Sequence, residues 1–357
     1  MVIKYFDIHS NIKIKIQSSD GSKMDTALMH LREFESEALD ENDIDIYVFD
    51  YSKRPNLERP TIISNYYYYS DNYLDVPDKN FCFNVVDSPF VIYCNTFVVP
   101  LNFFIELAFL KKGYTLIHSA AVQYNGKNYL FPAFGGIGKT TAVSAILNKD
   151  GKLFGDDMII VNNETILCYP LDFSIYPYHL DILNIEDKEA KAKFKRNGIL
   201  DRCISLLRRY DYRASRLLIL ILNSMKLPYI NIPPKKIFGE NCIATSGQID
   251  EIYYLYRVGE NKSQIEIEPI DANELAKICT NVLIQEWHGS MSILYTYSGL
   301  STFSLDYLFH NIKCVLEDVF MHHKCYQIKI PINLDNLSYQ NQLIFHLDNK
   351  RLEMGET

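Results

Sequence analysis

Residues 115–157 read TLIHSAAVQYNGKNYLFPAFGGIGKTTAVSAILNKDGKLFGDD and hold the strongest structural signal in the chain. Two β-prone runs, 115–124 and 127–134, are separated by Asn125-Gly126, the pair that best tolerates the positive φ angles of a two-residue type I′ turn. We therefore expect a β-hairpin in which the two residues flanking the turn face each other. Counting from that turn places His118 opposite Ala133, where the second strand ends.

A glycine-rich loop follows the second strand. Its residues are Phe134, Gly135, Gly136, Ile137, Gly138, Lys139, Thr140 and Thr141, and apolar residues at 142, 143, 146 and 147 predict a helix over 139–148. Such a loop can hold a polyphosphate, because backbone N–H groups converge on the anion and the helix N-terminus adds partial positive charge. Lys139 would reach the β- and γ-phosphates, and the Thr140 hydroxyl would bind Mg²⁺. The usual pattern is G-x-x-x-x-G-K-[ST]; here Ala133 replaces the first glycine, and a glycine-rich turn without a ligand is the alternative.

Two adjacent aspartates form the second element of the expected site. A short strand over 152–154 leads to Gly155-Asp156-Asp157, and a hairpin with Asn162-Asn163 at its tip follows. One helix and one strand suffice to bring the aspartates back to the loop. Consecutive strand residues point to opposite faces, so at least one aspartate must lie on a turn. We expect one carboxylate near Mg²⁺ and the other free to accept a proton from a hydroxyl; a simple turn is the alternative.

His118 is the third element. The hairpin register brings it to the glycine-rich loop, where it could steer a proton or share one with an aspartate or the γ-phosphate. A histidine with a purely structural role in the core is the alternative.

Composition limits the class of protein. The chain has 357 residues, 36 Lys and Arg, 44 Asp and Glu, and a formal net charge of −8, so we expect no nucleic-acid and no membrane partner. Its eight cysteines form no C-x-x-C pair, which argues against a zinc site or a disulfide scaffold. With no apolar stretch long enough for a membrane span, we expect a reduced, cytoplasmic protein.

The flanking sequence predicts two domains. Residues 1–100 read as a small N-terminal α+β domain, with a helix over 23–39 and strands over 12–16, 44–49, 83–86 and 91–99. Four tyrosines at 66–69 could stack on bases, but we interpret them as a half-buried strand. Residues 101–357 read as the catalytic domain. Beyond the central stretch, its expected elements are helices over 101–112, 272–287 and, as the last helix, 305–319, and strands over 251–258, 264–267 and 325–330.

Positive charge is concentrated in residues 187–216, which contain ten basic and four acidic residues. The pattern predicts a basic helical insertion at about 187–234, bounded by proline breaks. The segment is either a solvated helical face or a surface on which an acidic acceptor docks.

The stretch from His118 to Asp157 resembles the C-terminal catalytic domain of HPr kinase/phosphorylase, where a His, a glycine-rich Gly-Lys-[Ser/Thr] loop and an Asp-Asp pair occur in this order. Residues 133–141 and 152–157 are also similar to segments of ATP-dependent phosphoenolpyruvate carboxykinase. The resemblance implies an α/β fold with α+β character, built on a phosphoenolpyruvate-carboxykinase-like P-loop kinase core. It further implies ATP and Mg²⁺ as cofactors. Lys139 would contact the phosphates, Thr140 would bind Mg²⁺, and Asp156 would lie near the metal. Asp157 would accept the proton of the hydroxyl, with His118 assisting this proton transfer.

The expected function is therefore an HPr-kinase-like, ATP-dependent transfer of the γ-phosphoryl group to a hydroxyl, most simply a serine of a protein or peptide. The chain lacks the Glu-[Ile/Val]-Arg-Gly signature that HPr enzymes carry after the aspartates, so we expect a target other than HPr. A nucleotide-dependent regulatory protein without transfer, and a small-molecule kinase, are the alternatives. A homo-oligomer is compatible with either.

Overall fold

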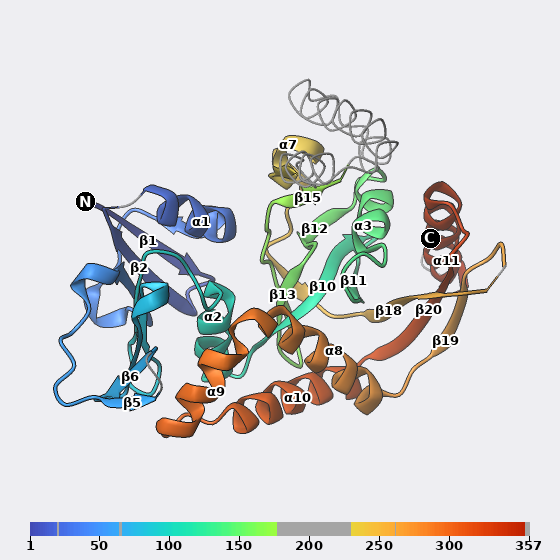
Figure 1. The fold of residues 1–357 in the computed structure, drawn as a ribbon. Helices are drawn as coiled ribbons and strands as arrows, with labels where there is room; N and C mark the ends of the chain where they lie inside the picture. Colours follow the sequence, from blue (N-terminus) through green and yellow to red (C-terminus); the bar gives the residue numbers. More distant parts are fainter. Residues whose placement is uncertain (20, 64–65, 177–229, 261, 354–357) are drawn as a thin grey trace, which may run out of the picture.

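The computed structural model describes residues 1–19, 21–63, 66–176, 230–260 and 262–353. Within them the chain forms a mixed α/β structure with two large mixed sheets and one two-stranded ribbon (Figure 1). The basic segment 187–216 lies outside the described residues, so its helices and its role stay predictions. Of the insertion expected at about 187–234, only the last residues are described.

The first sheet is built from residues 2–94. Its strand order is β3-β1-β2-β4-β9-β8-β7-β6-β5. The bounds are β1 Val2–Ile8, β2 Ile12–Ser18, β3 Glu35–Ser36, β4 Ile46–Asp50, β5 Thr61–Ile63, β6 Tyr67–Ser70, β7 Tyr73–Val76, β8 Phe81–Asn84 and β9 Phe90–Cys94. Every second residue of β2 is buried, as its alternating Ile pattern requires. Tyr67, Tyr68 and Tyr69 lie in β6 and are half-buried, which agrees with our interpretation as a strand, whereas Tyr66 lies in the turn before β6 and is exposed.

The first helix is shorter than the sequence predicts. Helix α1 spans Gly21–Leu31, and residues 32–34 form a single 3₁₀ turn. The expected extension to residue 39 is wrong because Glu35 and Ser36 pair with β1 as strand β3. Pairing with a strand that is distant in sequence here overrides local helix propensity. The strand expected over 91–99 likewise ends at Cys94.

The second sheet carries the central stretch. Its strand order is β17-β14-β13-β10-β11-β18-β20-β19, and β12 also pairs with β10. The bounds are β10 Thr115–Tyr124, β11 Lys127–Pro132, β12 Lys152–Gly155, β13 Met158–Val161, β14 Thr165–Leu167, β17 Ser246–Gln248, β18 Glu251–Val258, β19 Glu266–Pro269 and β20 Lys324–Pro331. The expected hairpin is present: Tyr124 pairs with Lys127, and Asn125 and Gly126 have φ angles of 51° and 79°.

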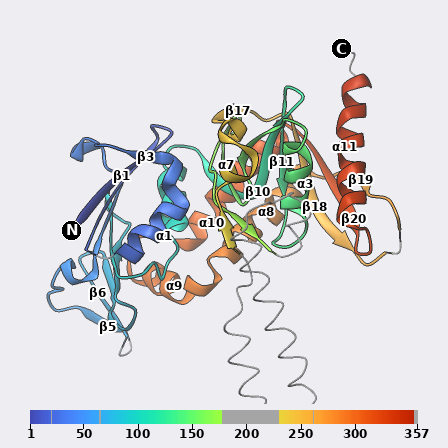
Figure 2. The same ribbon diagram turned by 90° about the horizontal axis from the view of Figure 1, so that it is seen from above.

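Helices cover both faces of the second sheet (Figures 1 and 2). Helix α3 (Lys139–Leu147) and helix α11 (Asn336–Glu353) lie on one face, and α8 (Ala272–Glu286) and α10 (Leu305–Met321) lie on the other. The strands divide their side chains accordingly. Ala120 and Val122 of β10 belong to the core under α3 and α11, whereas Ala121 belongs to the core under α8 and α10. This alternation is expected of a sheet buried on both faces.

The last helix expected from the sequence, over 305–319, is α10, but it is not the last. Helix α11 follows it and packs on α3, where the Gln340 amide donates to the Ser144 hydroxyl at 2.8 Å. The sequence analysis missed α11 because only a narrow apolar stripe, Tyr339, Leu343 and Leu347, is set among Asn and Gln residues. The shorter helices α2 (Leu101–Leu110), α7 (Pro234–Phe238) and α9 (Met291–Leu300), with the ribbon strands β15 (Phe173–Ile175) and β16 (Ile230–Ile232), complete the fold.

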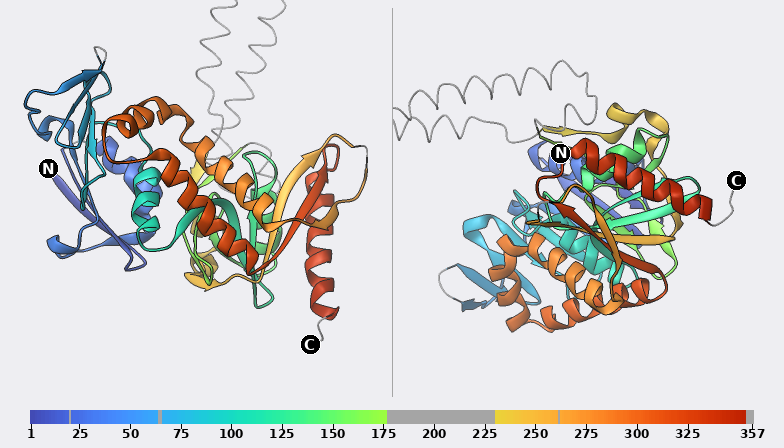
Figure 3. Two further views of the ribbon diagram at one scale, coloured as in Figure 1. Left: turned by 90° about the horizontal axis from the view of Figure 1, so that it is seen from below. Right: turned by 90° about the vertical axis from the view of Figure 1, so that its right-hand side faces the viewer.

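The two sheets are packed together. Figure 3 shows α9 and α10, in orange, running between them. The Tyr297 hydroxyl of α9 donates to the Asn72 carbonyl at 2.9 Å and accepts from the Val85 amide at 3.1 Å. One apolar cluster includes Phe83 of the first sheet and Leu116 of the second. The domain boundary at residue 100 stays a prediction. Within the described residues, no helix combines the length and apolar character needed to cross a membrane.

Candidate active site

The glycine-rich loop connects β11 to α3. Gly136 and Gly138 have φ angles of 75° and 130°, a region that side-chain-bearing residues rarely adopt. Gly138 is the N-cap of α3, and its carbonyl accepts from the Ala142 amide at 3.0 Å. The backbone N–H groups of the first turn thus lie at the head of a nine-residue helix, where an anion is stabilised by hydrogen bonding and by the helix dipole.

The two aspartates occupy a bend between β12 and β13, both of which pair with the same edge of β10. Gly155 permits this bend: a Cβ there would lie 2.8 Å from the Met158 carbonyl oxygen and 2.9 Å from that of Tyr169. The sequence analysis required at least one aspartate on a turn, and both lie on the bend. Their side chains differ, because Asp156 is half-buried with its Oδ1 atom shielded from solvent, whereas the Asp157 side chain is 52% exposed.

Asp156 points to the start of α3. Its Oδ2 accepts a hydrogen bond from the Thr140 hydroxyl at 2.7 Å, and its Oδ1 is buried without a hydrogen-bond partner in the described part of the chain. Burial raises the pKa of Asp156 to about 7, against the opposing effects of the Thr140 hydrogen bond and the Lys139 charge. A buried carboxylate oxygen without a partner is costly, and a cation beside it would remove that cost.

These two side chains fit Mg²⁺. Mg²⁺ is generally held by one or two protein oxygens together with substrate phosphates and water, and the Thr140 hydroxyl beside the Asp156 carboxylate at the glycine-rich loop supplies that number. The described residues contain no group of three His, Cys, Asp or Glu side chains that could hold a metal by themselves. When bound, the ion would neutralise phosphate charge.

His118 lies in a cluster of ionisable groups. Lys139 contacts its Nε2, Asp157 Oδ1 lies 3.6 Å from the same nitrogen, and Glu286 Oε1 lies 3.5 Å from Nδ1. Lys139 also donates to the Ala133 carbonyl at 3.3 Å. Burial, followed by the Lys139 charge, lowers the pKa of His118 to about 4, and burial also lowers the pKa of Lys139. The imidazole is therefore neutral at pH 7.

The place of His118 needs one correction. The hairpin ladder ends at Ser119 and Pro132, one pair short of the predicted partnership between His118 and Ala133. His118 instead pairs with Met158 of β13 on the opposite edge of β10. It still reaches the loop, because Lys139 bridges between its ring and the Ala133 carbonyl.

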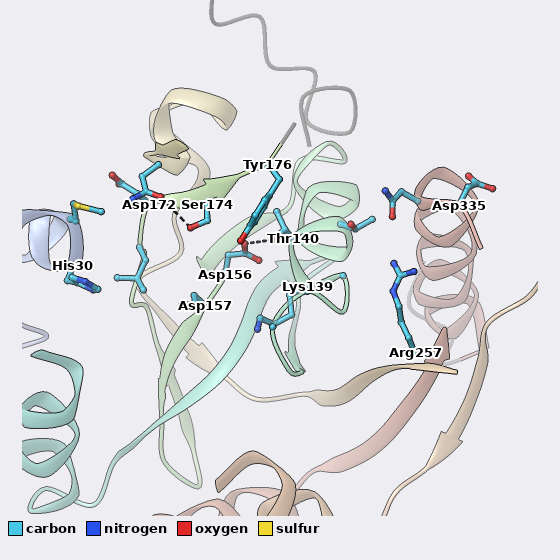
Figure 4. Close-up of a pocket in the computed structure, with 18 of the residues that line it drawn as sticks. His30, Lys139, Thr140, Asp156, Asp157, Asp172, Ser174, Tyr176, Arg257 and Asp335 are labelled. Atoms are coloured by element: carbon cyan, nitrogen blue, oxygen red, sulfur yellow. Dashed lines mark hydrogen bonds between the residues drawn. The ribbon is translucent and has the colours of Figure 1, made fainter. Parts of the chain in front are cut away.

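Lys139, Thr140, Asp156 and Asp157 line a cavity of about 1020 Å³, whereas His118 and Glu286 lie behind Lys139 and Asp157 and are not among its lining residues. Figure 4 shows Lys139, Thr140, Asp156 and Asp157 at its centre, with Arg257 and Asp335 on one side and His30 and Asp172 on the other. Of the expected loop residues, Gly135, Gly136, Gly138, Lys139, Thr140 and Thr141 line the cavity. Phe134 and Ile137 are not among the lining residues, although the Ile137 carbonyl accepts from Arg257 at 3.1 Å. The roles given to the predicted residues stay predictions.

The sequence analysis missed Arg257 and Glu286. Arg257 lies near the carboxyl end of β18, which runs parallel to β11, so it reaches the loop that follows β11. A charged residue at the end of an apolar strand was the available signal, since ligands bind outside the carboxyl ends of parallel strands. Glu286 ends α8, and no local pattern indicates that this helix end meets β10.

Comparison with known proteins adds little. No protein-family model matches the chain, and no curated protein matches it. Among solved structures, the Hpr(Ser) kinase/phosphatase from Coxiella burnetii matches with 11% sequence identity and a TM-score of 0.29, over 68% of this chain and 99% of that one. This distant likeness is too weak to identify the function of the chain.

Proposed function

We propose that this protein is an ATP-dependent kinase with a P-loop core of the HPr-kinase and phosphoenolpyruvate-carboxykinase type. The hydrogen bond from Thr140 to Asp156, whose other carboxylate oxygen is buried without a partner among the described residues, is the observation that carries the proposal. It sets a hydroxyl and a carboxylate oxygen where Mg²⁺ and the phosphates of a nucleoside triphosphate would lie. A glycine-rich turn without a ligand would not need to bury a carboxylate oxygen there.

The proposed reaction is an in-line displacement. An acceptor hydroxyl oxygen forms a bond to the γ-phosphorus, the bond from that phosphorus to the β,γ-bridging oxygen breaks, and ADP departs with the electron pair. Asp157, half-exposed beside His118, is the proposed acceptor of the hydroxyl proton. Lys139 exchanges its contacts with His118 and Ala133 for phosphate oxygens. His118, neutral at pH 7, then holds Asp157 in place. Positioning and charge neutralisation provide most of the acceleration.

The test is transfer itself. The protein is incubated with γ-labelled ATP and Mg²⁺ against pools of serine peptides and of small hydroxyl compounds, and products gaining a phosphate are identified by mass spectrometry. Asp157→Asn should reduce transfer by about a thousandfold or more while ATP affinity changes less than about threefold, because the proton acceptor is lost and the loop is intact. Asp306→Asn, on the exposed face of α10, is the matched control. A fully active Asp157→Asn variant contradicts the assignment.

Binding without transfer is the second candidate. It is favoured by the contacts that Lys139 makes with His118 and the Ala133 carbonyl, which withdraw the lysine from a phosphate. Tight ATP binding together with no labelled product in either pool would support this candidate over the kinase.

A further inference from the structure

The cavity extends past the proposed phosphate site to a second end, formed by the first helix of the chain and the short ribbon. Met29 and His30 of α1 line this end together with Leu171, Asp172 and Ser174 from the β15 segment. Figure 4 shows His30 and Asp172 on the side of Asp157 that faces away from Arg257. Asp157, the proposed proton acceptor, thus stands between the loop end and this α1 end.

The cavity is large for a single small ligand. Pockets for one small molecule span about 300–1000 Å³, and this cavity, at about 1020 Å³, lies just above that range. A nucleotide held by the loop occupies the end with Lys139 and Arg257. The remaining space lies against α1, within reach of the same carboxylate.

Contacts hold the α1 end together across a long sequence separation. Arg32 Nη1, just after α1, lies 3.5 Å from Asp172 Oδ1, and Lys235 contacts Glu33. The Ser174 hydroxyl donates to the Asn231 side chain at 3.3 Å, which joins β15 to β16 at this wall. The residues before 100 therefore contribute a wall to the cavity.

The two ends of the cavity differ in charge. The cationic side chains that line it, Lys139 and Arg257, are at the loop end, where Asp335 is engaged in capping α11 through the Ser338 amide at 2.9 Å. At the α1 end the charged lining groups are Asp157 and Asp172, and burial lowers the pKa of His30. Burial raises the pKa of Asp172, while the charges of Arg32 and Lys236 favour its ionised form. Arg32 pairs with Asp172 but is not among the lining residues, and its side chain is 47% exposed, so this pair is weak.

We propose that the α1 end is the acceptor subsite of the proposed kinase and that it selects a hydroxyl flanked by cationic or neutral hydrogen-bond donors over one flanked by anionic groups. The inference rests on the proposed function for the transfer step, but not for the binding preference. An acidic acceptor would bring its charge against Asp157 and Asp172, which like-charge repulsion disfavours. A lysine or arginine beside the reacting serine would instead meet Asp172.

Three peptides of one length test the preference. They are N-acetylated, C-amidated Ala-Xaa-Ser-Xaa-Ala with Xaa Lys, Gln or Glu, assayed with ATP and Mg²⁺. We expect kcat/KM to fall from the Lys peptide through the Gln peptide to the Glu peptide. The span, which is the ratio of kcat/KM for the Lys peptide to that for the Glu peptide, should be at least about tenfold. Asp172→Asn should reduce the span to about threefold or less and leave the KM for ATP unchanged, because it removes one of two charges. Asp306→Asn should preserve the full span. Equal kcat/KM for the three peptides, or an unchanged span in Asp172→Asn, overturns the proposal.

A second variant separates the subsite from the chemistry. His30→Ala should raise the KM for the Lys peptide by about fivefold with kcat and the KM for ATP little changed, whereas His310→Ala, on α10, should change none of the three. If the protein transfers to no peptide, binding of a fluorescein-labelled Lys peptide measures the subsite directly. Binding that is lost in Asp172→Asn then supports the subsite while the kinase reaction fails. Binding equal to that of the Glu peptide refutes the subsite.

Discussion

Glu106 lies in α2 with its side chain fully buried, and it holds the start of β10, the strand that carries His118. Its carboxyl group accepts two hydrogen bonds at 2.6 Å, from the Thr115 hydroxyl to Oε1 and from the Leu116 amide to Oε2. Burial raises the pKa of Glu106 to about 8, despite both hydrogen bonds. The perturbation we consider is Glu106→Gln, which keeps the shape and removes the ionisation.

The sign and size follow from proton linkage. Between pH 4.5 and about 8 the folded chain holds a proton on Glu106 that the unfolded chain has released, so the stability contributed by the neutral carboxyl falls as pH rises and is lost above pH 8. At about 1.4 kcal/mol for each pH unit, the change amounts to about 5 kcal/mol as an upper bound. Glutamine can retain both contacts. Its side-chain oxygen accepts from the Leu116 amide, and its side-chain amide donates to the Thr115 hydroxyl oxygen. The Thr115 hydroxyl then donates to the Leu116 carbonyl oxygen, which is 3.3 Å away.

The assay is urea unfolding of the wild type and Glu106→Gln from pH 5 to pH 9. We expect the two free energies of unfolding to agree within about 1 kcal/mol at pH 5, and the variant to become more stable by several kcal/mol at pH 9. Glu240→Gln, at an exposed position, is the control and should show no such divergence. A difference between Glu106→Gln and wild type that stays constant from pH 5 to pH 9 would refute the reasoning, because the carboxyl would then titrate alike in both states.

Three further predictions concern the site. Gly138→Ala should weaken ATP binding about tenfold or more in calorimetry, since Gly138 has a φ of 130°. Gly259→Ala, outside the cavity, with nothing within 4 Å and no positive φ, should not weaken it. Equal affinities of the two variants would contradict the requirement for glycine at 138. The Mg²⁺-dependent part of ATP binding should be about tenfold weaker at pH 6 than at pH 8, because Asp156, with a pKa of about 7, must ionise to hold the cation. If Mg²⁺-dependent binding does not change with pH, Asp156 is not a ligand of the cation. Glu286→Gln should lower kcat about threefold to tenfold and shift its pH profile, with the KM for ATP unchanged, because it removes the carboxylate charge that lies 3.5 Å from Nδ1 of His118. An unaltered pH profile argues for a structural role only.

The centre of the fold could be predicted from the sequence because its signals are local. Asn125-Gly126 fixes a turn, the turn fixes the register, and the alternation of β10 follows from it. The glycine-rich loop and the return of Asp156 to Thr140 depend on one helix and one strand, so few alternative geometries exist. These short-range features account for the loop and for the contact between Thr140 and Asp156.

The remaining parts of the site depend on contacts between distant segments. Glu286 reaches His118 only because α8 packs across β10, and Arg257 reaches the loop only because β18 pairs in parallel with β11. Neither helix packing nor parallel pairing has a local signature that specifies its partner. The part of the cavity wall that α1 contributes could not be predicted for the same reason. Where α1 ends depends on the pairing of β3 with β1, which is a contact between distant segments.

The arrangement of β10 explains why one hairpin register controls the whole site. β10 pairs with β11 along one edge, and with β13 and then β12 along the other edge. The glycine-rich loop and the aspartate bend therefore leave the sheet on opposite sides of the same two residues of β10, Ser119 and Ala120. The Ser119 amide donates to the Asp157 carbonyl at 3.1 Å and fixes the bend to the strand. A slip of one residue would turn every side chain of β10 to the opposite face and move His118 away from both Lys139 and Asp157. The residues that specify the turn are therefore as necessary to the site as the groups that line it, although none of them lies in the cavity.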